Sequence, residues 1–98
     1  MAEAEAARRW RQHPGLVEEE LDGERVVWDP ASGRVARLDR IGSLVWACLD
    51  GSTGLDELSG DLADAFAADP GTVRADVEQL VARLAELGFL ISEPDQPI

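Results

Sequence analysis

The sequence of 98 residues has no lysine, asparagine or tyrosine, and it has only one cysteine and one histidine. A single cysteine excludes a disulfide framework and a cysteine-rich metal site within the chain. A single histidine leaves little for metal binding or acid–base catalysis, because histidine is the side chain that titrates near neutral pH. No apolar run approaches the roughly 20 residues that a membrane span requires. These shortages argue against a metalloenzyme and against a membrane-spanning protein.

Negative charge is abundant. The chain has 20 acidic residues and 9 basic ones, all arginine, for a net charge of -11. Residues 1–40 hold 7 arginines and 9 acids (net -2), whereas residues 41–98 hold 2 arginines and 11 acids (net -9). A chain of this charge repels nucleic-acid backbones unless its positive charges are concentrated. A hydrophobic content of 45% still indicates one folded domain.

The two ends of the chain are expected to lie outside the folded domain. The start carries charges where a signal peptide needs an apolar stretch, which predicts a cytoplasmic protein. We expect residues 1–15 to form a flexible, partly helical N-terminal arm that is broken by Pro14-Gly15. Residues 16–91 are expected to form the domain, and residues 92–98 a C-terminal tail.

Turn signals divide the first part of the domain into a three-stranded antiparallel meander. Leu16–Leu21 is a weak strand that ends at the hairpin signal Asp22-Gly23. Residues 25–29 form a better strand, in which Val26 and Trp28 share one face. After a longer loop over 29–33, residues 34–38 return as the third strand, with Ala36 and Leu38 on one face.

Three helices are expected to follow the meander. The first is capped by Asp39 and has an apolar stripe at helical spacing, which comprises Ile41, Leu44, Val45, Cys48 and Leu49. This stripe predicts a buried, reduced Cys48, and it leaves Trp46 off its centre. The apolar face of the second helix, which begins near Leu55 after Gly54, comprises Leu55, Leu58, Leu62 and Phe66. The third helix runs from Asp69-Pro70 to Gly88. This order is typical of an α+β, winged helix-turn-helix-like domain.

Catalytic and metal-binding patterns are missing. His13 has no partner at ligand spacing, no Gly-x-Ser-x-Gly elbow surrounds a serine, and no calcium-binding loop is present. A buried Cys48 would be a poor nucleophile, since apolar surroundings disfavour the thiolate. We therefore predict a protein that is not an enzyme and that has no cofactor and no metal.

DNA binding is disfavoured although the helix order suggests it. The third helix sets Arg74 and Arg83 against Asp76, Glu78 and Glu86, and the second helix has no basic residue. Phosphate would therefore meet net negative charge. A peptide is a better partner, because an edge strand of the meander offers unpaired N–H and C=O groups. The third strand and its end hold the basic cluster of the domain, Arg34, Arg37 and Arg40, which could bind a peptide or merely protect the edge from aggregation.

The stretch from Val26 to Ile91 resembles the PqqD family, the small peptide chaperones of pyrroloquinoline quinone biosynthesis, whose domain is also called the RiPP recognition element. The matching segments, in order, are Arg34-Val-Ala-Arg-Leu38-Asp39, Val45-Trp46-Ala-Cys-Leu49-Asp50-Gly51, Glu57-Leu58, Asp76-Val77, and Leu84 with Gly88-Phe89-Leu90. Two positions depart from the family pattern: Asp39 replaces an asparagine, and Gly54 replaces a threonine. Both concern helix starts.

The resemblance implies a non-catalytic domain of natural product biosynthesis that binds the leader of a ribosomally synthesised precursor peptide and presents it to a modifying enzyme, such as a radical SAM protein. The leader would add a strand beside the third strand, and the implied peptide-binding residues are Arg34, Val35, Ala36, Arg37, Leu38, Val73, Asp76, Val77 and Leu80. Val77 and Leu80 are also core candidates by periodicity. Two alternatives stay open: a winged-helix transcriptional regulator, and an adaptor subunit without a precursor peptide.

Overall fold

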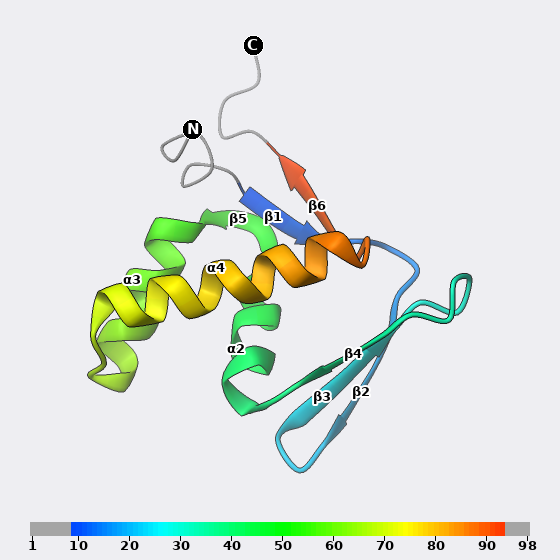
Figure 1. The fold of residues 1–98 in the computed structure, drawn as a ribbon, viewed down its shortest axis with the longest axis horizontal. Coiled ribbons are helices and arrows are strands. Elements are labelled where there is room, and N and C mark those ends of the chain that lie inside the picture. The colour runs from blue at the N-terminus through cyan, green and yellow to red at the C-terminus, as the bar shows by residue number, and fades with distance from the viewer. Residues whose placement is uncertain (1–8, 94–98) are drawn as a thin grey trace.

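The meander forms one of two small sheets in a computed structural model, which describes residues 9–93 (Figure 1). Its strands are β2 (Val17–Leu21), β3 (Glu24–Trp28) and β4 (Val35–Leu38), which pair antiparallel in the order β2-β3-β4. The turn at Asp22-Gly23 has positive φ at both residues (55° and 82°), the conformation that joins two strands through a two-residue hairpin. The predicted meander is therefore confirmed.

One face of the meander points into the core. Val27, Ala36 and Leu38 are almost completely buried on this face. Val26 and Trp28 do share a face, as predicted, but it is the opposite one, because side chains alternate along a strand and both residues stay partly exposed.

A second sheet joins distant parts of the chain in the order β5-β1-β6. Its central strand, β1 (Arg9–Gln12), pairs antiparallel with β5 (Asp50–Gly54) and with β6 (Leu90–Glu93). The predicted partly helical arm is thus wrong for residues 9–12, and residues 1–8 lie outside the described part of the chain. The predicted tail over 92–98 begins inside β6, and its residues 94–98 also lie outside the described part.

The three predicted helices are present: α2 (Arg40–Cys48), α3 (Leu55–Phe66) and α4 (Pro70–Glu86). The Asp39 carboxylate accepts a hydrogen bond from the Gly42 N–H at 2.7 Å and caps α2. Asp69 accepts one from the Thr72 N–H at 2.9 Å and caps α4. The chain is therefore an α+β domain of antiparallel strands and three helices, and no helix within residues 9–93 is long and apolar enough to cross a membrane.

The buried side of α2 differs from the predicted stripe. Trp46 is 1% exposed and central to the core, whereas Ile41 and Leu44 are 47% and 44% exposed. Cys48 is exposed, so the prediction of a buried thiol is wrong. Burial of the large Trp46 indole sets which side of α2 faces the core. The Gln12 side-chain amide of β1 donates to the Trp46 carbonyl at 2.8 Å, which links α2 to the second sheet.

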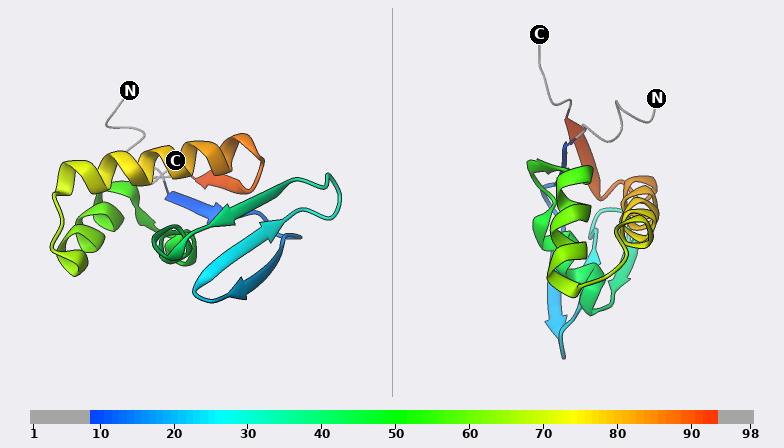
Figure 2. Two further views of the ribbon diagram at one scale, coloured as in Figure 1. Left: turned by 60° about the horizontal axis from the view of Figure 1, so that its bottom comes forward. Right: turned by 90° about the vertical axis from the view of Figure 1, so that its left-hand side faces the viewer.

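The core lies where the two sheets and the helices meet. Its largest completely buried side chains are Trp46, Phe89, Leu38, Leu49, Leu84 and Val27. Phe89 and Leu90 pack back on this core. The longest helix, α4, extends along one face of the molecule, packing on α3 near its start and on β6 near its end (Figures 1 and 2).

Candidate functional site

Strand β4 forms one edge of the meander, and its backbone pattern shows which groups face outward. The Asp29 N–H donates to the Arg34 carbonyl at 2.9 Å, which makes Asp29 and Arg34 a hydrogen-bonded pair. Such pairs alternate with non-hydrogen-bonded ones in an antiparallel ladder. Ala36 therefore bonds to β3, whereas the N–H and C=O of Val35 and of Arg37 point to the free edge. Within residues 9–93 no backbone hydrogen bond reaches these groups from another element.

The loop before β4 is fixed by local hydrogen bonds. The Gly33 N–H donates to the Asp29 carbonyl at 2.7 Å, and Gly33 has the positive φ (77°) that this closure needs. A hydrogen bond from the Ser32 side chain and one from the Ala31 N–H lower the pKa of the Asp29 carboxyl below its usual value. The ionised carboxylate thus holds the turn that sets the start of β4.

Helix α4 runs beside β4 in the opposite direction (Figure 2). At the start of β4, the Arg34 Nη1 donates to the Leu87 carbonyl, just after the end of α4, at 3.2 Å. Just after β4, a Cβ added to Gly42 would lie 3.6 Å from the Leu38 Cβ and 3.7 Å from the Leu80 Cδ2, so Leu80 of α4 approaches the end of the strand. The end of α4 therefore meets the start of β4 through Arg34, and Leu80 lies near the end of the strand.

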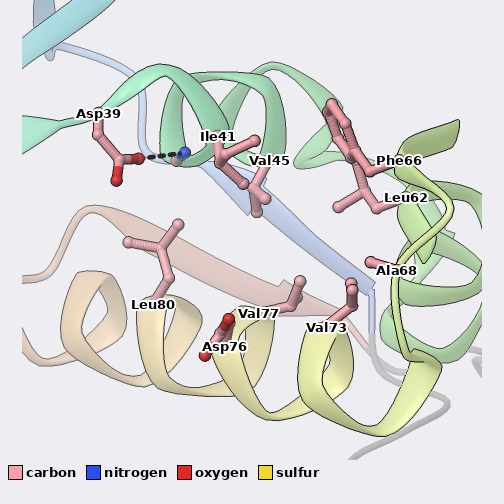
Figure 3. A pocket seen from close by; sticks show the side chains of 11 residues that line it. Asp39, Ile41, Val45, Leu62, Phe66, Ala68, Val73, Asp76, Val77 and Leu80 are labelled. Atoms are coloured by element: carbon pink, nitrogen blue, oxygen red, sulfur yellow. Dashed lines mark hydrogen bonds between the residues drawn. The ribbon is translucent and has the colours of Figure 1, made fainter.

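A cavity of about 380 Å³ opens where β4 ends, between α2, α3 and α4 (Figure 3). Its lining residues are Asp39, Ile41, Gly42, Val45, Leu62, Phe66, Ala68, Val73, Asp76, Val77 and Leu80. All four residues that the resemblance implies on the third helix are among them. Val77 is only 3% exposed, so it serves both as cavity wall and as core. Val73 and Leu80 are partly buried.

Sequence reasoning missed the walls that α2 and α3 contribute. Ile41 and Phe66 were assigned to buried stripes by periodicity, yet both are nearly half exposed and line the cavity (Figure 3). A second hollow of about 330 Å³ is lined by Asp76, Gln79, Leu80 and Arg83. It shares Asp76 and Leu80 with the cavity, so the two hollows adjoin along α4.

The basic residues of the strand region do not form one cluster. Arg34 reaches the end of α4, whereas Arg37 is exposed and lies opposite Val26 on the outer face of the meander. Arg40 turns toward the β2–β3 hairpin, where its Nε lies 3.2 Å from the position that a Cβ on Gly23 would take. Of these three arginines, only Arg34 therefore faces the space between β4 and α4.

Asp39 and Asp76 are the acidic residues that line the cavity, and Arg34 is not part of its lining. Asp39 is occupied in part by its cap on α2, and Asp76 is exposed on α4. At the start of α4, hydrogen bonds from the backbone N–H and the hydroxyl of Thr72 lower the pKa of the Asp69 carboxyl. Among residues 9–93, no group of three or more His, Cys, Asp or Glu side chains could hold a metal ion.

The fold and the site together define a small α+β domain in which a long helix lines an apolar cavity that opens beyond the end of a free strand edge. Residues 24–90 match the family described as coenzyme PQQ synthesis protein D (PqqD). This match covers more than half of the chain, and the chain belongs to the PqqD family. A comparison with curated proteins gave no match.

Three solved structures share the fold. The complex of TbiB1 with the TbiA(beta) leader peptide is 24% identical, with a TM-score of 0.72 over 82% of this chain and 93% of that one. Lasso peptide synthetase B1, complexed with its leader peptide, is 20% identical, with a TM-score of 0.74 over 85% and 98%. The PqqD part of Methylobacterium extorquens PqqCD, described as a stand-alone RiPP recognition element, is 24% identical, with a TM-score of 0.69 over 84% and 87%.

Proposed function

We propose that this domain binds the leader of a ribosomally synthesised precursor peptide as an added strand on β4. One observation carries the proposal: the outward N–H and C=O groups of Val35 and Arg37 form a free edge, and an apolar cavity lined by α4 opens beyond the end of the strand. Main-chain pairing at a sheet edge supplies affinity in this mode, and pockets for alternate side chains supply specificity. The proposed binding residues are Arg34, Val35, Ala36, Arg37 and Leu38 on the strand side and Val73, Asp76, Val77 and Leu80 on the helix side.

Family membership supports this function. Two structures that share the fold were solved with leader peptides bound, and a third is named as a RiPP recognition element. We infer that this domain likewise has no catalytic activity and delivers its peptide to a modifying enzyme, such as a radical SAM protein, in the cytoplasm. The exposed Cys48 lies at the end of α2 and does not line the cavity.

We also infer a winged helix-turn-helix likeness, in which α3 and α4 form the helix pair and the meander forms the wing. A transcriptional role does not follow from that likeness. Arg74 of α4 is already paired with Asp56 and with Glu78, so its charge is neutralised by neighbours. Net negative helices would repel DNA phosphates.

Isothermal titration calorimetry tests the proposed function. The titrant is the synthetic leader of a precursor peptide encoded beside the gene of this protein, and we expect saturable binding of one leader per domain. Circular dichroism should first show that the domain is folded. A folded domain that binds no such leader would contradict the proposal, and the absence of any precursor reading frame beside the gene would favour the adaptor alternative.

A further inference from the structure

The space between β4 and α4 has a direction that a bound peptide would have to match. The side chains of Arg34, Ala36 and Leu38 point to the side of the meander where α4 lies. The side chains of Val35 and Arg37, which alternate with them, point to the other side. Every second side chain of a strand added beside β4 would point to that same side. The charges and cavities along α4 therefore select those side chains.

One end of this space is positive. Arg34 uses one of the five N–H donors of its guanidinium on the Leu87 carbonyl, which leaves donors for a ligand. Arg83 is exposed on α4, one helical turn before Leu87, and lines the second hollow. Neither arginine has an ion-pair partner among residues 9–93. A carboxylate at this end would meet two cations that no acidic neighbour within the described residues neutralises.

The other end is apolar and bordered by negative charge. The cavity walls there are aliphatic and aromatic, including the half-exposed Ile41 and Phe66. Asp76 lines both hollows and has no hydrogen bond or ion pair to other described residues. An apolar side chain fits this cavity, and a cation beside it would pair with Asp76.

The two ends are separated by a fixed length of strand. Asp39, where the lining of the cavity begins, follows Arg34 by five positions. A strand added beside β4 advances at the same rise of roughly 3.3 Å per residue, and only every second side chain points to the groove, so an even separation of roughly four or six residues divides the side chains that reach the two ends.

We propose that this groove selects a leader segment with charges in a set order: an acidic residue that faces Arg34 and Arg83, then, roughly four or six residues away, a large apolar residue that fills the cavity, and, two positions from it on the same side of the strand, a basic residue that faces Asp76. This inference rests on the proposed function and states which leaders the site accepts. It also assigns Arg83, Ile41 and Phe66 as specificity residues of the groove.

Selection from a random peptide library tests the inference without knowledge of the natural leader. The probe is a displayed library long enough to span both ends of the groove, roughly 14 residues. We expect enriched peptides to combine an acidic residue, the stated spacing, and an apolar residue with a basic residue two positions away. Enriched peptides without this pattern would overturn the inference and leave the proposed function intact, whereas a failure to enrich any peptide would overturn both.

Charge-reversal variants then assign the ends. One enriched peptide, labelled with fluorescein, is titrated with the wild-type chain and with Arg34→Glu, Arg83→Glu and Asp76→Lys. Each should weaken binding about fivefold or more, because reversal replaces an attraction with a repulsion. The matched controls Arg40→Glu and Asp61→Lys make the same charge changes outside the groove, and they should leave the affinity unchanged. If Arg34→Glu disturbs the contact with Leu87, Arg83→Glu still tests the positive end of the groove. Equal effects in the groove variants and the control variants would overturn the inference.

Discussion

The meander has two free edges that offer the same backbone groups but differ in their surroundings. Along β4, the outward groups belong to Val35 and Arg37. Along β2, the two-residue turn makes Leu21 and Glu24 a hydrogen-bonded pair, so alternation leaves Glu18 and Glu20 facing outward. Either edge could therefore accept an added strand as far as hydrogen bonding is concerned.

What differs is the neighbourhood of each edge. All five residues of β2 are exposed, and Glu18 and Glu20 pair with Arg25 across the strand at 2.8 Å and 3.9 Å. Three consecutive glutamates along an edge are a protection against unwanted strand pairing. Beside β4, by contrast, stand α4 and an apolar cavity. An edge becomes a binding site when a second surface beside it can receive side chains, and the predictions below test this difference.

The largest effect is expected from Val35→Pro. Proline removes the outward N–H of residue 35, which a bound leader would need, while the bonds to β3 are kept. Leader binding should become undetectable by calorimetry with the folded state preserved. The matched variant at the other edge is Glu20→Pro, which also removes an outward N–H and should bind the leader normally. Equal loss in both variants would contradict the assignment of the site to β4.

Ala36→Pro is the control for the interpretation of that loss. Ala36 is 5% exposed, and its N–H faces β3 in the ladder. Loss of a buried ladder hydrogen bond should lower the free energy of unfolding by about 1–3 kcal/mol. Urea denaturation should show this cost for Ala36→Pro and a smaller one for Val35→Pro. The reverse order would show that the alternation of hydrogen bonds along β4 is misassigned.

A smaller effect is expected from Leu80→Ala. Leu80 is partly buried, lines both hollows and lies close to the end of β4. Truncation removes apolar surface that a leader side chain would cover, which should weaken binding by about fivefold. Leu44→Ala removes the same atoms from a half-exposed leucine of α2 outside the cavity and should leave affinity unchanged. If Leu44→Ala weakens binding as much, the leader contacts a wider surface than the cavity.

Salt should have a modest effect on leader binding. Raising sodium chloride from about 0.05 M to about 0.5 M screens exposed charge pairs and should weaken binding by about twofold to threefold. Arg34→Gln should reduce this salt dependence, whereas Arg40→Gln should retain it because Arg40 turns toward the β2–β3 hairpin. Binding that does not respond to salt would show that the arginines only protect the edge.

The smallest effect is expected on the stability of the start of α4, the helix that lies beside β4 and has no counterpart beside β2. The Thr72 hydrogen bonds lower the pKa of Asp69 in the folded state below its ordinary value of 3.8. A lowered folded pKa means that the stabilisation by Asp69 is present above the unfolded pKa and is lost as pH falls through the folded pKa. Asp69→Ala should therefore lower the Tm slightly at neutral pH, and the difference from wild type should shrink in acid. A difference that grows in acid would contradict this cap.

Much of the fold follows from local signals in the sequence. Asp22-Gly23 marks a hairpin, and Asp39 and Asp69 mark helix starts, because each acts through groups within three residues. Strand β1 could not be predicted in this way. Arg9–Gln12 alternates weakly and is held by partners about 40 and 80 residues away, which no short window contains.

One wall of the cavity could be predicted from the family resemblance and not from local signals. The resemblance indicated Val73, Asp76, Val77 and Leu80 on one wall, and the structure brings them together. The opposite walls depend on the rotation of α2, which is set by where Trp46 finds room in the core. Periodicity alone predicts that Cys48 and Ile41 are buried. Both are exposed because the Trp46 indole occupies the core side of α2.

The pairing of Trp28 with Val35 has a consequence for spectroscopy. Trp28 is partly exposed and lies directly across from Val35 in a non-hydrogen-bonded pair, where the side chains of two strands are closest. A peptide strand bound at Val35 would cover the neighbourhood of this indole, whereas Trp46, at 1% exposure, stays shielded. Trp28 would therefore serve as a fluorescent reporter of the proposed occupied edge, and Trp46 as an internal reference that occupancy leaves unchanged.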